Sequence, residues 1–257
     1  MISAVIITYN EEHNIARCIR ALDGLADEII LVDSFSKDNT VAIAESLGAK
    51  VLQHVFEGYG EQKRIAISHA SHDWLLSVDA DEVVSPELKQ SILAIKGKEQ
   101  YAAYQFPFLT NYCGHWIRHS GWYPSPKARL WDKRKGEMTA DKVHEGWNLH
   151  NPNDPIGNLK GDILHYSFPT ISAHLKKIEH YSENGARFDV ARGKKVSLMK
   201  LLFAPKIAFF KDFILRGGFL DGYYGYIVCK NSAFAAYAKY AKIRQYTEMQ
   251  QKGAFTN

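Results

Sequence analysis

Two acidic residues separated by one position, Asp79 and Asp81, directly follow an apolar run at 74–78 (WLLSV). Carboxylate oxygens are the ligands that Mg²⁺ and Mn²⁺ prefer, and these ions usually also take phosphate oxygens of a substrate. The ordinary alternative is a solvated turn ahead of the helix that Pro86 opens. The position at the end of an apolar strand favours a metal site, with Mn²⁺ or Mg²⁺ as the expected cofactor.

Two further polar clusters follow predicted strands. The first strand covers 4–9 (AVIITY) and leads into Asn10 and Glu11, and the second covers 28–33 (EIILVD) and ends in Asp33. Ligands of open parallel sheets bind beyond the carboxyl ends of the strands, so we expect these clusters and Asp79 to meet at one edge. Asp33 is suited to accept hydrogen bonds from a uracil or ribose, or only to cap the turn at 34–39.

Short apolar runs alternate with amphipathic segments through the first 90 residues. Strands are expected at 4–9, 28–33, 50–55 and 74–78, and the first helix is expected to be capped by Asn10. Further helices are expected near 42–47, at 62–70 and from Pro86. This alternation predicts an α/β fold with a mostly parallel sheet and helices on both faces.

The pattern changes after Tyr101. An aromatic, roughly alternating run at 101–112 and the segments KARLWDK and DILHYSF predict a mixed or antiparallel extension of the sheet. From Thr170 apolar residues repeat at helical spacing, which predicts a helical C-terminal region. Its last helix is expected at 232–248, after glycines that interrupt the pattern at Gly217, Gly218, Gly222 and Gly225.

Composition excludes several classes of protein. The chain has 257 residues, of which 46% are hydrophobic and 23% charged, which is enough for a sizeable core and unlike a disordered chain. Three scattered cysteines form no CxxC pair, which favours a reducing compartment. No signal peptide is recognisable, and no apolar run reaches the roughly 18–20 residues that cross a bilayer. We therefore expect a cytoplasmic protein, either soluble or peripheral.

The formal net charge of +4 is mild, and the basic residues form no continuous stripe with aromatic residues, so we expect no nucleic-acid partner. The chain also has neither a GxGxxG nor a GxxxxGK[ST] motif. A nucleotide would therefore bind without a glycine loop around its phosphates, and a metal ion would have to balance the diphosphate. That requirement agrees with the paired acids Asp79 and Asp81.

The runs AVIITYNEE, EIILVDSFSKDNT, GYGEQKR and WLLSVDADE together resemble the donor-binding half of family-2 inverting glycosyltransferases. The bacterial group that includes lipopolysaccharide-core β-glucosyltransferases is the most similar. The likeness is dense over residues 2–90 and continues in RLWDKRKGEM, KVHEGW, ILHYS and FLDGYYGY. It implies the GT-A fold, with a catalytic domain at 1–170 and a helical extension at 171–257. Residues 1–90 would bind the nucleotide sugar, and residues 100–170 would face the acceptor.

The resemblance also implies roles for individual residues. Contacts to a UDP-sugar would come from Thr8, Tyr9, Glu11, Asp33, Asp38, Lys63 and Asp79. Asp81 would bind the metal with Asp79 beside it. His165 is a candidate third metal ligand or diphosphate contact, or a histidine that backbone groups satisfy. Lys63 could instead lie on a solvated helix face, and Arg129 could neutralise a phosphate or an anionic acceptor, or simply pair with an acid.

The family usually places its catalytic carboxylate in an acidic pair downstream of the DxD motif. Here Val143-His144-Glu145 stands at that place. We expect Glu145 to act as the base that deprotonates the acceptor hydroxyl, with His144 as the rival base and a structural His–Glu pair as the ordinary alternative. The QxxRW signature of processive synthases is missing, which favours transfer of one sugar per acceptor.

The predicted function is therefore transfer of a single hexose, glucose from UDP-glucose, to a saccharide or glycolipid acceptor such as lipopolysaccharide core. Two alternatives remain at this point. A non-catalytic carbohydrate- or nucleotide-binding module would have no need of Asp79, Asp81 and Glu145. A sugar-nucleotide-forming nucleotidyltransferase normally has a glycine-rich basic loop after its first strand, and TYNEEHN is not one. The sequence carries no signal for an oligomeric state.

Basic residues interleave with aromatic ones from Lys194 to Arg216, and Phe209, Phe210 and Phe213 fall on one helical arc. A helix face buried in the core is the ordinary interpretation of such an arc. The alternative is a peripheral membrane contact through 194–216 at the inner face of the plasma membrane, because an enzyme with a lipid-linked acceptor must reach the bilayer.

Overall fold

The computed structural model describes residues 1–138 and 146–252. Contacts divide the chain into two compact units. Unit 1 consists of Met1–Leu109 and Ser125–His165, and unit 2 consists of Thr110–Pro124 and the chain from Tyr166 onward. Each unit is therefore built from two separate stretches of sequence.

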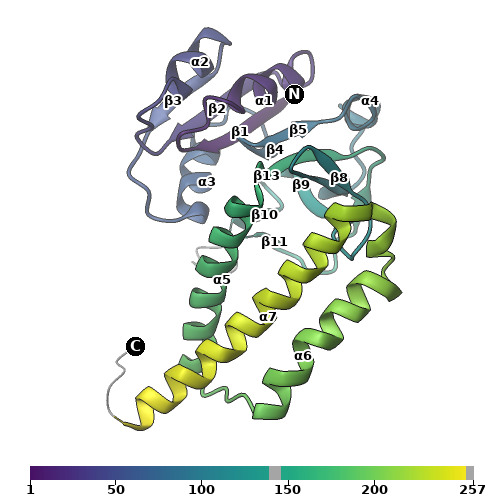
Figure 1. The fold of residues 1–257 in the computed structure, drawn as a ribbon. Coiled ribbons are helices and arrows are strands. Elements are labelled where there is room, and N and C mark those ends of the chain that lie inside the picture. The colour runs from purple at the N-terminus through teal and green to yellow at the C-terminus, as the bar shows by residue number, and fades with distance from the viewer. Residues whose placement is uncertain (139–145, 253–257) are drawn as a thin grey trace. The chain divides into compact units, whose positions relative to one another are not determined.

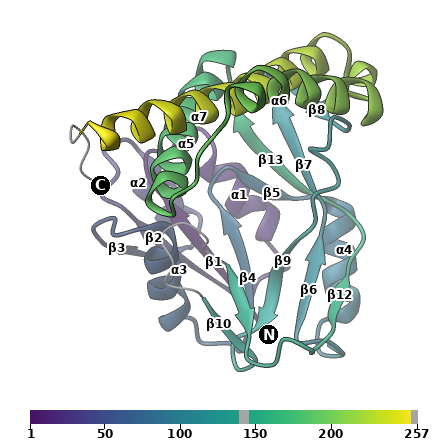
Figure 2. The same ribbon diagram turned by 90° about the horizontal axis from the view of Figure 1, so that it is seen from below.

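Unit 1 is organised around a seven-stranded sheet whose strand order is β12-β6-β9-β4-β1-β2-β3 (Figures 1 and 2). The strands are β1 (Ile2–Thr8), β2 (Glu28–Asp33), β3 (Lys50–Gln53), β4 (Trp74–Asp79), β6 (Ala103–Phe106), β9 (Lys127–Asp132) and β12 (Ile156–Asn158). The pairs β4·β1, β1·β2 and β2·β3 are parallel, whereas β9 runs antiparallel to both β4 and β6. The predicted parallel sheet with a mixed extension is thus confirmed.

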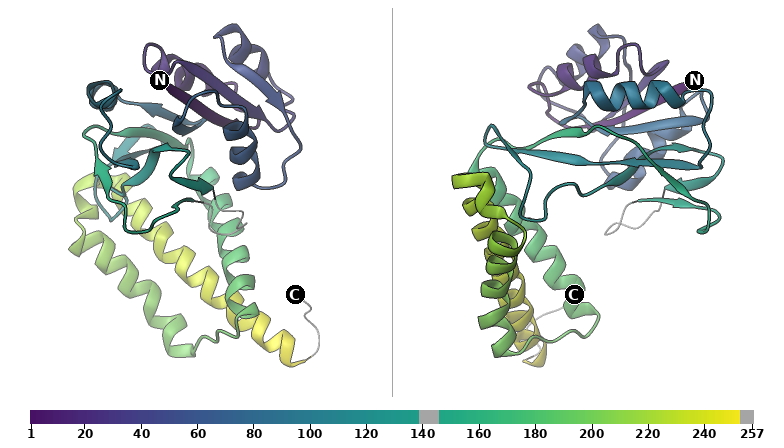
Figure 3. Two further views of the ribbon diagram at one scale, coloured as in Figure 1. Left: turned by 180° about the vertical axis from the view of Figure 1, so that it is seen from behind. Right: turned by 90° about the vertical axis from the view of Figure 1, so that its right-hand side faces the viewer.

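Helices cover both faces of this sheet. They are α1 (Ile15–Leu22), α2 (Thr40–Ser46), α3 (Tyr59–Ser68) and α4 (Pro86–Ile95). On one face Ala4 and Ile6 of β1 pack in a core with residues of α1 and α4, and α4 runs along the sheet in the right panel of Figure 3. On the other face Val5 packs with Ala66 of α3. Alternate residues of one strand therefore serve two cores, which explains the unbroken apolar run at 4–7 within β1.

Two smaller pairings complete unit 1. Strand β10 (Gly136–Met138) pairs antiparallel with β11 (Trp147–Leu149). Strand β5 (Glu82–Val84) pairs antiparallel with the first residues of β13 (Ile163–Phe168), so that His165 lies opposite Glu82.

The predicted cap of the first helix is wrong. Helix α1 begins at Ile15, with Asn14 rather than Asn10 at the N-cap position. Asn10 instead adopts a left-handed backbone with φ of 54°, a conformation that asparagine tolerates better than most residues. Its backbone N–H donates to Ser36 Oγ and its side-chain oxygen accepts from Lys37 N. Asn10 therefore joins two loops at the strand ends instead of starting a helix.

Unit 2 contains a hairpin and three long helices. The last three residues of β7 (Phe108–Tyr112) lie in this unit and pair antiparallel with β8 (His115–Ile117). The helices are α5 (Ile171–Ala191), α6 (Leu198–Phe210) and α7 (Gly222–Gln251), and α7 lies between α5 and α6 (Figure 1). A π-helical turn at Lys211–Leu215 and a 3₁₀ turn at Gly218–Asp221 connect α6 to α7. Within the described residues, no helix is long and apolar enough to cross a bilayer.

Helix α7 begins ten residues before the expected start at 232, because Gly225 does not interrupt it. A Cβ atom on Gly225 would overlap the carbonyl oxygen of Gly218, and a Cβ on Gly218 would lie 2.6 Å from Cys229 Sγ. These glycines permit a close approach between the 3₁₀ turn and α7. Sequence reasoning took them for helix breakers, although their function in the structure is packing.

Candidate functional site

The carboxyl ends of three neighbouring strands bring the predicted polar residues of unit 1 together. Across the parallel pairs, Thr8 lies beside Asp33, and Ile7 lies beside Asp79. Adjacent strands are about 4.8 Å apart, so the last residues of β2 and β4 flank the end of β1 at short range. The shared edge that the sequence analysis required is present.

Two cations hold Asp79 at this edge. Lys63 Nζ lies 3.2 Å from Asp79 Oδ1, and Arg129 Nη2 lies 3.0 Å from Asp79 Oδ2. The Lys63 side chain is only 8% exposed, so it lies in the site and not on a solvated helix face. Arg129 was expected to contact a phosphate or an anionic acceptor, or to pair with an acid. In the structure it pairs with an acid, Asp79.

Glu82 is a member of this cluster that the sequence analysis missed. Its side chain is 1% exposed, and its Oε1 lies 3.3 Å from Arg129 Nη2. Its Oε2 accepts a hydrogen bond of 2.9 Å from the backbone N–H of Asp79. Glu82 thus fixes both the guanidinium and the end of β4. Its place directly after the DxD motif was the available signal.

The charges within the cluster compensate one another. Burial acts to raise the pKa of Asp79, but the charges of Arg129 and Lys63 outweigh it and hold that pKa far below its ordinary value. For Glu82 burial is stronger, and with the nearby Asp79 it raises the pKa despite the Arg129 charge. Asp79 is therefore a carboxylate with both oxygens engaged.

Asp81 and His165 form a second, more accessible pair. His165 Nε2 lies 3.3 Å from Asp81 Oδ2, and the two side chains are 22% and 21% exposed. Among the described residues, no three His, Cys, Asp or Glu side chains gather as a complete metal cluster. A carboxylate and an imidazole side by side nevertheless fit two positions of a divalent ion whose remaining ligands are phosphate oxygens and water.

The β2–α2 loop is held by carboxylates. Asp33 is fully buried, accepting hydrogen bonds from Ser36 N at 2.9 Å and Gln53 Nε2 at 3.3 Å. Asp38 accepts from Thr40 N at 3.0 Å and, across the loops, from Glu12 N at 3.2 Å. These bonds fix the loop that would carry a nucleoside, and their contribution to nucleotide binding stays a prediction.

The edge also presents aromatic surface and an unused hydroxyl. Tyr9 and Phe35 are 53% and 49% exposed, and the two loops that carry them are joined by the bond from Ser34 N to Thr8 O. Glu11 binds the same region through its N–H, which donates to Thr40 Oγ1. Thr8 Oγ1 is buried without a hydrogen-bond partner among the described residues. Phe35 was not predicted, since a single phenylalanine in a polar loop gives no pattern.

Two predicted residues cannot be placed. Glu145 and His144 lie outside the described residues, so their proposed role as base rests on the sequence.

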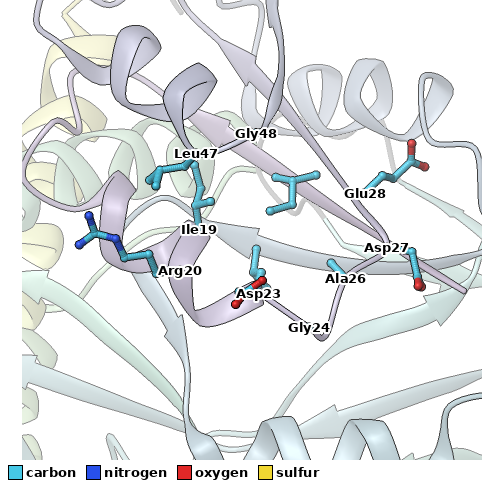
Figure 4. Close-up of a pocket in the computed structure, with 11 residues that line it drawn as sticks. Ile19, Arg20, Asp23, Gly24, Ala26, Asp27, Glu28, Leu47 and Gly48 are labelled. Atoms are coloured by element: carbon cyan, nitrogen blue, oxygen red, sulfur yellow. The ribbon is translucent and has the colours of Figure 1, made fainter.

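A pocket of about 460 Å³ lies elsewhere in unit 1 (Figure 4). Asp23, Asp27 and Glu28 contribute carboxylates to it, and Arg20 contributes a cation. Glu28 is the first residue of β2, whereas Asp33 of the candidate site is its last residue. This pocket is therefore at the opposite end of the strand. It is separate from the candidate site.

Comparison with known proteins identifies the family. The family model described as glycosyl transferase family 2 matches residues 3–152, which is more than half of the chain. The chain belongs to glycosyltransferase family 2. An uncharacterized glycosyltransferase of Rickettsia typhi is 36% identical over 95% of this chain and 87% of its own length. A lipopolysaccharide core biosynthesis glycosyltransferase of Rhizobium meliloti is 29% identical over 95% of this chain and 92% of its own.

A solved structure has a similar fold. A glucosyl-3-phosphoglycerate synthase from Mycobacterium tuberculosis has a TM-score of 0.50 at 18% identity, covering 77% of this chain and 81% of that one. The predicted GT-A fold, with its mixed sheet and helical C-terminal region, is confirmed, as is the predicted glycosyltransferase class. Membership of family 2 favours this class over the nucleotidyltransferase and the non-catalytic binding module.

Proposed function

We propose that this family-2 glycosyltransferase is metal-dependent and inverting, and that it transfers a single hexose, glucose from UDP-glucose, to a saccharide or glycolipid acceptor. The observation that carries the proposal is the shared edge of β1, β2 and β4, where Thr8, Asp33 and Asp79 meet. Asp81, two residues beyond the end of β4, pairs with His165 of β13. One nucleotide sugar can then reach nucleoside contacts and a metal site along the same edge.

Asp81 and His165 would hold Mn²⁺ or Mg²⁺, with Asp79 beside them. When bound, such an ion stabilises the negative charge of the departing diphosphate. The mycobacterial synthase, whose structure contains Mn²⁺, uridine diphosphate and glucosyl-3-phosphoglycerate, supports a divalent ion in this fold.

The chain's own cations would contribute at the same place. Lys63 and Arg129 are held on Asp79, so their positive charges are preorganised close to where a diphosphate would lie. The nucleoside would contact Thr8, Tyr9, Glu11 and Asp33, and Asp38 would brace their loop. The exposed rings of Tyr9 and Phe35 are suited to cover the face of a uracil.

An inverting transfer needs one base that removes the proton of the acceptor hydroxyl as this oxygen attacks the anomeric carbon. We assign that step to Glu145, with His144 as the alternative. Glu145→Gln should retain UDP binding, measured by calorimetry, and lose transfer by about a hundredfold, since base catalysis commonly contributes roughly 10²–10⁴ in rate. Loss of UDP binding in this variant would mean that Glu145 is structural.

The acceptor is proposed from the relative of Rhizobium meliloti, whose name places it in lipopolysaccharide core biosynthesis. A lipid-linked core saccharide would require the enzyme to work at the inner face of the plasma membrane. The absence of QxxRW supports addition of one sugar to each acceptor.

The decisive experiment compares Asp81→Asn and His165→Gln with Asp23→Asn, a control at the opposite end of the sheet. UDP release from UDP-glucose is measured with acceptor and Mn²⁺. We expect the first two variants to lose activity by about a hundredfold or more, because removal of one preorganised electrostatic contact costs roughly 10²–10³ in rate. Asp23→Asn should stay near wild type. Full activity of Asp81→Asn, or of the wild type in chelator, would refute the metal role.

A further inference from the structure

Helix α6 of unit 2 carries apolar residues on every side, with Lys200 and Lys206 as its only charged residues, yet none of its residues is buried. Such a helix normally lies inside a large protein or in contact with lipid. Of 24 large apolar side chains that are exposed in the described chain, ten lie between 198 and 220: Leu198, Met199, Leu202, Phe203, Ile207, Phe210, Ile214, Leu215, Phe219 and Leu220. We call this set the α6 surface. Single exposed apolar residues are ordinary, whereas a contiguous group of this size marks an interaction site.

The helix uses only one side for internal packing. Phe209 contacts Tyr226 of α7 with ring centroids 5.9 Å apart, and Phe213 contacts the same ring at 5.9 Å. The predicted aromatic arc therefore divides, because Phe210 is 62% exposed on another side. Figures 1 and 3 show α6 at the edge of the helices of unit 2, beside α7.

The exposed side has regular helical spacing. Met199, Leu202, Phe203, Ile207 and Phe210 follow one another at intervals of three, one, four and three residues, which places them on a single broad stripe. The stripe continues through the π-helical turn to Ile214 and Leu215, and Leu215 is 82% exposed. The exposed apolar surface therefore runs along α6 and the π-helical turn that follows it. It is much larger than a pocket for a single side chain.

Positive charge surrounds this surface. Residues 192–216 contain seven lysines and arginines and one acid, Asp212. Asp212 pairs with Arg216, whose Nη1 lies 3.0 Å from Asp212 Oδ1, and Lys194 pairs with Asp189 at 2.9 Å, so the other five cations give this segment a net positive charge. Lys200 and Lys211 are exposed at the border of the apolar stripe, whereas the exposed Lys206 lies within it, with its Nζ 5.7 Å from the centroid of the Phe203 ring. Long cationic side chains at the border of an apolar helix face are typical of helices that lie in the headgroup region of anionic membranes.

We propose that the α6 surface docks this protein on a bilayer with anionic headgroups, as a monotopic contact with α6 parallel to the membrane. The charge decides between a bilayer and a second copy of the chain. Two copies that met through this surface would bring like charges together, whereas anionic lipid complements them. The inference goes beyond the proposed function, and it stands on unit 2 alone.

Flotation of the full-length protein with vesicles tests the proposal. Vesicles of phosphatidylcholine with 30% phosphatidylglycerol should bind the wild type, pure phosphatidylcholine should bind it at least tenfold more weakly, and high salt should weaken the binding. Phe203→Ser/Ile207→Ser should reduce partition into anionic vesicles at least tenfold. Its matched control is Leu175→Ser/Tyr237→Ser, which removes two exposed apolar side chains from α5 and α7 and should bind as the wild type does.

The charge is tested in the same way. Lys200→Gln/Lys206→Gln should reduce binding severalfold at low salt, while Lys98→Gln/Lys176→Gln, which removes two exposed lysines elsewhere, should change it little. Circular dichroism confirms that each variant is folded. Release of UDP with a water-soluble acceptor should be unchanged in the α6 variants, so failure of docking and failure of transfer are separate results.

Three outcomes would overturn the proposal. The first is no binding of the wild type to anionic vesicles at low salt. The second is equal binding of Phe203→Ser/Ile207→Ser and its control. The third is a dimeric wild type in light scattering that becomes monomeric only in Phe203→Ser/Ile207→Ser, without vesicle binding, since a second copy would then cover the surface.

Discussion

The two units of this protein satisfy their side chains in different ways. In unit 1 the residues at the strand ends are charged, and the chain itself supplies their partners, as the contacts of Asp79 with Lys63 and Arg129 demonstrate. In unit 2 ion pairs such as that of Lys239 with Asp189 join α7 to α5, glycines allow close packing, and one helix keeps an apolar side exposed. A polar site can be complete within one chain, whereas an exposed apolar surface implies something outside it.

The comparison predicts that unit 1 depends most strongly on charge compensation. Arg129→Met should lower the free energy of unfolding by about 3 kcal/mol, because it leaves Glu82 and Asp79 facing each other without their shared cation. Arg64→Met is the matched control, since Arg64 pairs with Glu61 at the surface and its side chain is 50% exposed. Its cost should be below about 1 kcal/mol. Urea unfolding measures both, and equal costs would refute the compensated cluster.

Unit 2 should respond instead to a change of shape. Gly225→Ala places a methyl group against the Gly218 carbonyl oxygen, so we expect a loss of about 2 kcal/mol, as for other overpacked sites. Gly185→Ala on α5 is the control. Its new Cβ would meet only the end of the flexible Lys239 side chain, at 3.3 Å, and alanine favours a helix interior. Thermal unfolding should therefore separate the two variants, and similar melting temperatures would contradict the close approach.

Unit 2 should also lose stability in mild acid. Burial, with a smaller effect of Lys177, lowers the pKa of His174 from 6.5 to about 4. The folded state thus keeps this imidazole neutral, whereas the unfolded state protonates it below pH 6.5. The free energy of unfolding is therefore highest above pH 6.5 and falls as the pH drops toward 4. Between pH 7 and 5 this group should cost roughly 1–2 kcal/mol.

The measurement is the pH dependence of urea unfolding in the wild type and in His174→Gln. Glutamine can still bond to Tyr112 Oη and Asn231, which His174 contacts at 3.1 Å each, but it does not titrate. The difference between the free energies of unfolding of the wild type and His174→Gln should therefore shrink as the pH falls. Parallel curves would show that His174 is not the group responsible.

Most strands of unit 1 could be predicted from the sequence, because apolar runs alternate regularly with amphipathic segments. The run EIILVD became β2 with the expected bounds, Glu28–Asp33, and WLLSV became β4 with one more residue, Asp79. Continuous apolar runs between amphipathic segments leave few other arrangements. The strand ends were therefore predictable, and with them the positions of Asp33 and Asp79.

The partners of these residues were less predictable. The ion pair between Lys63 and Asp79 joins a helix to a strand, and the one between Arg129 and Glu82 joins β9 to β5. Such contacts depend on tertiary packing, which no local spacing encodes. The same holds for Gly225, where a glycine needed for a close approach cannot be told from a helix breaker by sequence alone.

The discontinuous build of unit 2 matters to anyone who wishes to shorten this enzyme. The ring of Tyr112 lies against those of Phe168 and Tyr224, and the centroid of the Trp122 ring lies 5.4 Å from that of Phe168. Trimming the gene after β13 would keep Tyr112, Trp122 and Phe168 but discard Tyr224 and His174, whose rings also pack on Tyr112. The resulting fragment should be prone to aggregate during expression. A usable minimal version must retain both stretches of the unit, or replace the hairpin together with the helices.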